Sequence, residues 1–218
     1  MERSERPEPP ERFDEGDFGL SWLTTMFHAD WTRGTATGPE AVRYHLAPDL
    51  GPKAVLALRR DAVRLADGLG RADIETLWQA ATNPGGVFSD PPRGFTSGTA
   101  WMRAVVAECD AWLAVRPGSA PLAGADLEDG SCDSDAVLAE IDRAQDLPEG
   151  TRTALAHCAT GCTPELAFRL LLRAVCEHGL RTGARLSPER YARLEALGSR
   201  MRYGPYLVPE VEFLVTGE

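Results

Sequence analysis

Four proline-led segments mark the starts of amphipathic helices along this chain. In each, a residue that can cap a helix stands before the proline, and the segments are Thr37-Gly38-Pro39-Glu40, Gly51-Pro52, Thr163-Pro164-Glu165 and Ser187-Pro188-Glu189. Proline suits the first helical turn because its missing N–H would have no intrahelical partner there. Serine and threonine accept hydrogen bonds from first-turn N–H groups, and glutamate favours the positive end of the helix dipole. The chain is therefore expected to be built from helices.

Apolar residues between these starts recur with helical spacing. Leu20, Leu23, Phe27 and Trp31 lie three and four residues apart, as the buried face of a helix requires. No run rich in valine, isoleucine and threonine alternates apolar and polar residues for long enough to require a strand. The pattern predicts an all-α fold, arranged either as two small helical bundles or as one continuous multi-helix bundle.

Capping and breaking residues set the expected bounds of the helices. Helical segments are expected at residues 18–31, 39–46, 53–69, 72–81, 134–145, 149–159, 164–178 and 187–200, with one more after a cap at Thr96, Ser97 or Thr99. Gly68 and Gly179 are interpreted as stop signals. Residues 205–213 are expected to be irregular, with a possible last turn at 209–215.

Composition shifts divide the chain into four parts. Residues 1–17 are charged and proline-rich and lack the apolar run of a secretory signal, so a disordered tail is expected. Residues 18–116 and 133–218 each contain several helical patterns and are interpreted as helical domains. Between them, residues 117–132 combine glycine, proline and acidic residues, which is typical of a linker.

The overall charge narrows the classes of partner. A formal net charge of −10 repels phosphate, so nucleic acid is not an expected partner. The sequence contains no apolar run of eighteen residues, so no membrane association is expected. The five cysteines are expected to be reduced thiols, and the protein is expected to be cytoplasmic.

Acidic residues concentrate between residues 126 and 149. Nine carboxylates stand there against Arg143 as the single base. One interpretation is a linker kept solvated by its charge. The other is a surface that attracts a basic protein partner, with partner-binding residues Asp126, Glu128, Asp129, Asp133, Asp135, Glu140 and Asp142.

Residues that could bind a metal or perform catalysis do not form a recognised pattern. His157, Cys158, Cys162 and Cys176 are the nearest to a metal set, but three residues separate Cys158 from Cys162, and zinc signatures use a tighter pair. His178 lies two helical positions beyond Cys176 and points about 200° away from it. No nucleophile elbow or phosphate loop is present. We therefore expect no metal, no cofactor and no enzymatic activity.

Five features in order resemble the immunity proteins of bacterial contact-dependent growth inhibition systems. They are an apolar helix ending in Phe27-His28-Ala29-Asp30-Trp31, the turn Gly38-Pro39-Glu40, a long helix from Val55 to Leu69, the turn Pro91-Pro92-Arg93-Gly94, and a following helix that carries Trp101. The resemblance covers residues 18–116. It departs at Ser97-Gly98-Thr99, where the family has a Tyr-Arg type of helix start, and it does not extend over residues 117–218.

The resemblance implies a small helical protein that binds and silences a toxin domain. It also implies that Phe27, Asp30, Trp31 and Trp101 hold the fold together. Contact residues for the toxin do not carry over, because the binding face differs between members of the family. The expected function is neutralisation of a cognate toxin, such as a basic nuclease domain, by occlusion. The alternative is a metal-dependent regulator or adaptor that uses the histidine and cysteine residues of the C-terminal half.

Overall fold

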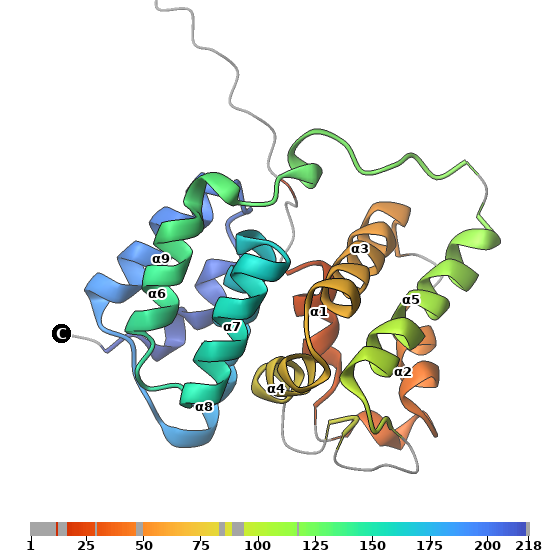
Figure 1. The fold of residues 1–218 in the computed structure, drawn as a ribbon, viewed down its shortest axis with the longest axis horizontal. Helices are drawn as coiled ribbons and strands as arrows, with labels where there is room; N and C mark the ends of the chain where they lie inside the picture. Colours follow the sequence, from red (N-terminus) through yellow and green to blue (C-terminus); the bar gives the residue numbers. More distant parts are fainter. Residues whose placement is uncertain are drawn as a thin grey trace, which may run out of the picture.

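The computed structural model describes residue 12 and residues 17–28, 30–46, 50–82, 86–88, 94–116 and 118–216. Over these residues the chain is all-α, as the sequence predicts (Figure 1). The α-helices are α1 (Gly19–Met26), α2 (Gly38–His45), α3 (Pro52–Gly68), α4 (Arg71–Ala81), α5 (Gly98–Ala114), α6 (Ser134–Arg143), α7 (Glu149–Gly161), α8 (Pro164–Thr182) and α9 (Pro188–Arg200). Short 3-10 helices are η1 (Trp31–Arg33), η2 (Gly124–Leu127), η3 (Ser131–Asp133) and η4 (Val208–Leu214).

The helix starts follow the predicted capping chemistry. The side chains that accept a hydrogen bond from a first-turn N–H group are Thr37, Ser97, Thr163 and Ser187. Each helix that they cap begins at the next residue. Local sequence therefore contributes to all four boundaries. Residues from other elements add acceptors at two of them, namely Asp129 at the start of α8 and Glu75 at the start of α5.

Several helices end one or more residues away from the predicted end, and two of these differences have a clear structural cause. The first apolar helix stops at Met26, and Trp31 lies in the separate turn η1, because Phe27 leaves helical geometry at φ −97° and ψ 55°. Helix α8 continues past Gly179 to Thr182 and ends at Gly183, whose φ is 74°. A Cβ on Gly179 would lie 2.5 Å from a methyl carbon of Leu214, so this glycine permits close packing and does not stop the helix.

The two halves of the chain pack against each other. Figure 1 shows α1, α2, α3 and α5 on one side and α6–α9 on the other, with α4 between the two groups. Helix α5 packs along α3, while α4 contacts both α7 and α8, and α1 contacts α8 as well as α3. The chain is thus folded around α4 and α8.

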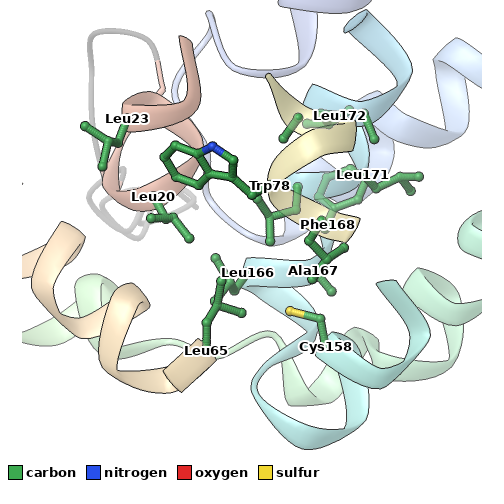
Figure 2. Close-up of a cluster of buried hydrophobic side chains, with 14 of the residues drawn as sticks. Leu20, Leu23, Leu65, Trp78, Cys158, Leu166, Ala167, Phe168, Leu171 and Leu172 are labelled. Atoms are coloured by element: carbon green, nitrogen blue, oxygen red, sulfur yellow. The ribbon is translucent and has the colours of Figure 1, made fainter. Parts of the chain in front are cut away.

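One buried hydrophobic cluster spans both halves of the described chain. In Figure 2, Leu20 of α1, Leu65 of α3 and Trp78 of α4 face Leu166 and Phe168 of α8. All five are at most 2% exposed. Of the two arrangements predicted for the helices, this shared core corresponds to the continuous bundle.

The segment expected to be a disordered tail contributes one residue to the interior. The side chain of Arg12 is only 1% exposed, and its backbone N–H donates to the carbonyl of Arg202 at 3.0 Å. Lys53 donates to the carbonyl of Arg12 at 2.7 Å. The rest of residues 1–16 lies outside the described residues.

Among the helices that are described, none has the length and apolar character needed to cross a bilayer.

Candidate functional site

Aromatic side chains from four elements form a single cluster in the N-terminal half. The ring of Phe27 lies 5.3 Å from Trp31, 5.1 Å from Trp78 and 5.4 Å from Trp101 between centroids. Trp78 and Trp101 meet edge to face at 5.1 Å. Three of the four residues predicted as structural anchors, Phe27, Trp31 and Trp101, therefore pack together and are at most 5% exposed.

The fourth predicted anchor, Asp30, does not take part in this core. It lies on the surface and pairs with Arg33 at 3.0 Å, with the two side chains 49% and 80% exposed. An ion pair as exposed as this one contributes little to stability, because water and salt screen it. Asp30 makes local hydrogen bonds at the start of η1, where its carbonyl accepts the N–H of Arg33 and its own N–H donates to Nδ1 of His28.

Of the predicted Pro91-Pro92-Arg93-Gly94 turn, only Gly94 falls within the described residues.

Three of the nine carboxylates between residues 126 and 149 pair with arginines of α9. Asp133 pairs with Arg200 at 2.5 Å, Glu140 with Arg193 at 2.6 Å, and Asp146 with Arg190 at 2.9 Å. Glu140 is buried, and it also accepts from Arg143 at 2.8 Å. These ion pairs hold α9 against α6, so Glu140 is not placed to contact a partner.

The preceding acidic residues hold the segment between the two halves in place. Asp126 pairs with Lys53 of α3 at 2.9 Å, and its carbonyl accepts from Arg60. Glu128 pairs with Arg202 at 2.8 Å. The carbonyl of Asp129 accepts the first-turn N–H of Glu165 in α8 at 3.0 Å, and its carboxylate accepts the N–H of Ser131 at 2.9 Å. This stretch, predicted as a linker, is thus bound to both halves of the fold.

Two of the seven predicted partner-binding carboxylates remain on the exposed surface, namely Asp135 and Asp142 of α6. They stand seven residues apart, which is two helical turns, so both occupy one face of α6. Glu149, at the first residue of α7, is also exposed. We call Asp135, Asp142 and Glu149 the exposed carboxylate set. These carboxylates differ from the paired ones because their charge faces solvent.

A buried ionic cluster joins the halves where α1, α3 and α8 meet. Arg169 of α8, whose side chain is 0% exposed, donates to Asp61 of α3 at 2.7 Å and to Glu165 at 2.6 Å. It also donates to the Ser21 hydroxyl and the Phe18 carbonyl, both at 2.8 Å. One guanidinium thereby satisfies acceptors from both halves. This arrangement provides the donors that buried carboxylates need.

Burial and neighbouring charges shift the pKa values of Asp61 and Tyr203 in this cluster. Burial by itself raises the pKa of Asp61, but Arg169 and Arg60 outweigh it and hold this pKa below the usual value. Burial and the neighbouring Glu165 raise the pKa of Tyr203 well above its usual value. Tyr203 donates to Glu165 at 3.1 Å, and Arg12 pairs with Glu165 at 2.8 Å. Near neutral pH, Asp61 is therefore ionised and Tyr203 is neutral.

The histidine and cysteine residues considered as metal ligands are dispersed among different partners. His157 pairs with Asp73 of α4 at 2.9 Å. Cys158 is buried beside the partly exposed Cys162, and Cys176 is buried on α8. Within the described part of the chain, no group of three or more histidine, cysteine or acidic side chains is arranged to hold a metal ion.

Sequence reasoning missed the buried cluster, although one signal was visible. Glu165 and Arg169 stand four residues apart on the most apolar helix, and a charged pair within such a stripe indicates a buried ion pair. The third partner, Asp61, is more than 100 residues away in sequence, so no local pattern could identify it.

Comparison with known proteins adds no further assignment. No protein-family model, curated protein or solved structure matches this chain. The candidate functional surface is therefore assigned from the structure of this chain alone.

Proposed function

We propose that this protein is an immunity-type binder that neutralises a cognate bacterial toxin, such as a basic nuclease domain, by occluding it in the cytoplasm. The observation that carries this proposal is the aromatic cluster. Phe27, Trp31 and Trp101 belong to the motifs through which residues 18–116 resemble immunity proteins of contact-dependent growth inhibition systems, and all three pack around one point. The two motifs that carry these residues thus pack against each other, which supports the resemblance.

Charge supports the choice of a basic partner. The formal net charge is −10, and a nuclease domain that binds phosphate is usually basic. Opposite net charges accelerate encounter between proteins, and a toxin must be captured before it acts. An acidic binder gains both attraction and speed.

We propose that the exposed carboxylate set is the surface that attracts the basic toxin domain. Asp133, Glu140 and Asp146 are neutralised by arginines of α9, so their fields are weak at a distance. Asp135 and Asp142 present their charge to solvent from one face of α6. A basic partner is therefore attracted mainly by this face.

The test measures association between this protein and the toxin domain encoded beside its gene. The variant Asp135→Lys/Asp142→Lys reverses the charge of the proposed face. The control Asp67→Lys/Glu212→Lys changes the net charge equally at exposed positions of α3 and η4. We expect the first variant to associate several-fold more slowly and with a flatter salt dependence, because charges at the rim of an interface act mainly on association.

The results distinguish two claims, namely that the protein binds a toxin and that it does so through the exposed carboxylate set. Equal association rates for the two variants would show that the exposed carboxylate set is not the landing face. Absence of any complex between the wild-type chain and the toxin domain would reject the immunity function itself. The metal-dependent alternative gains no specific support from the dispersed positions of His157, Cys158 and Cys176.

A further inference from the structure

Two cysteines lie four residues apart where α7 ends and α8 begins. Cys158 occupies the last turn of α7, and Cys162 is the capping residue that follows this helix. The backbone N–H of Cys162 donates to the carbonyl of Cys158 at 2.9 Å. Side chains four residues apart on a helix lie on the same face, so the two thiols are neighbours.

Cys162 is the more accessible of the two thiols. Its side chain is partly exposed, and its Sγ donates to the carbonyl of Arg64 at 3.1 Å, a hydrogen bond that ends when the thiol ionises. The hydrogen bond from Cys158, together with the charge of Arg64, lowers the pKa of Cys162. The Nη1 atom of Arg64 is buried and has no hydrogen-bond partner, so this guanidinium has a donor available for an anion. A thiolate is the nucleophilic form of cysteine.

Cys158 has the opposite environment. Its side chain is 0% exposed, and Figure 2 shows it directed from α7 toward Leu65 and Leu166. The hydrogen bond to Cys162, together with burial, raises the pKa of Cys158 well above its usual value. A dissolved oxidant therefore reaches Cys162 first. Pairs of one accessible and one shielded thiol are typical of redox-sensitive sites.

We propose that Cys162 and Cys158 form an oxidation site that a hydroperoxide converts to a disulfide at the end of α7. The Cys162 thiolate attacks the peroxide oxygen, which breaks the O–O bond and leaves a sulfenic acid on Cys162 and hydroxide. The Cys158 thiol then attacks this sulfur, the S–S bond forms, and water leaves. Overall, two thiols and one hydrogen peroxide give one disulfide and two waters.

Helix geometry permits the bond after a local adjustment. A rise of about 1.5 Å per residue places Cα atoms four residues apart ~6 Å from each other, within the ~4.4–6.8 Å span of disulfides. Cβ atoms at this spacing are about 5–6 Å apart and must approach to ~4 Å. Cys162 already leaves helical geometry, with φ −116° and ψ −96°, so the adjustment falls on the end of α7.

The adjustment acts on a contact between the two halves of the chain. A Cβ on Gly68 of α3 would lie 2.5 Å from the carbonyl oxygen of Gly161 and 2.7 Å from the Sγ of Cys162. Movement of Cys162 into a disulfide withdraws its hydrogen bond from Arg64 and alters this close packing. Oxidation is thus expected to loosen the end of α3 against α7.

To test this proposal, the full chain is treated with hydrogen peroxide and digested with trypsin. The peptides are then analysed by mass spectrometry. Cleavage after Arg152 and Arg169 releases residues 153–169, which contain both cysteines. The exposed Cys132 lies in a different peptide and serves as the control thiol. We expect the 153–169 peptide to lose the mass of two hydrogens several-fold faster than Cys132 is oxidised.

Two variants separate the roles of the sulfurs. Cys158→Ser should accumulate a sulfenic acid on Cys162 that dimedone traps, whereas Cys162→Ser should abolish oxidation of this peptide. A far-UV circular dichroism spectrum equal to that of the wild type establishes that each variant is folded. The proposal is overturned if the peptide keeps both thiols while Cys132 is oxidised, or if dimedone labels Cys162 equally with and without Cys158.

Discussion

Replacement of Arg169 by methionine tests whether the buried ionic cluster holds the two halves together. The guanidinium is 0% exposed and donates to Asp61, Glu165, Ser21 and Phe18 at 2.6–2.8 Å. Methionine fills a similar volume but leaves two buried carboxylates without this donor. Removal of one partner from a buried ion pair costs about 3–5 kcal/mol, because the remaining charge is poorly solvated. We expect the free energy of unfolding to fall by this amount.

Arg43→Met is the matched control. Arg43 makes an equally short bidentate pair with Glu108, at 2.7 and 2.9 Å, but its side chain is 66% exposed. An exposed pair contributes little to stability, because water and salt screen it. Both variants are unfolded in urea and followed by far-UV circular dichroism, with the free energy extrapolated to zero denaturant. If Arg169→Met and Arg43→Met lose similar stability, burial does not amplify the interaction and the reasoning is refuted.

Three further substitutions test other parts of the fold. Trp101→Ala should lower the free energy of unfolding by about 3–5 kcal/mol, because Trp101 is fully buried against Phe27; an unchanged melting temperature would contradict this. Gly179→Ala should destabilise the chain and shift η4, because the added methyl group meets Leu214 at 2.5 Å; an unchanged urea midpoint would show that η4 adjusts without cost. Burial raises the pKa of Asp17 from 3.8 to about 7. Between these two pH values the folded chain keeps a proton on Asp17 that the unfolded chain has lost. The free energy of unfolding therefore decreases as pH rises toward 7. Asp17→Asn should remove that decrease in urea unfolding series from pH 5 to 8, and parallel curves for the two proteins would argue against it.

Local sequence predicted the fold class because the signals for helix starts are local. A threonine or serine beside proline satisfies first-turn N–H groups whatever the rest of the chain does, so the starts of α2, α8 and α9 were predictable. The end of α8 was not, because Gly179 is required by contact with Leu214, which lies 35 residues further along the chain. Glycine as a stop signal and glycine as a close contact look identical in sequence.

The candidate site was predictable only as a concentration of charge. The sequence identifies nine acidic residues between 126 and 149, but it does not identify which of them have partners. Arginines of α9 lie 44–67 residues from the carboxylates that they bind, and only the fold brings them together. Asp135 and Asp142 could therefore be separated from Glu140 only with the structure in hand.

Calorimetric titration of the purified chain with the toxin domain encoded beside its gene is the most direct test of the proposed function. We expect saturable binding of one toxin domain per chain, with a dissociation constant within the range of about 10⁻⁷–10⁻¹⁰ M that is typical of antibody–antigen complexes. We also expect that affinity falls as salt concentration rises, since opposite charges attract the partners. The absence of binding between two folded proteins at low salt would contradict the account.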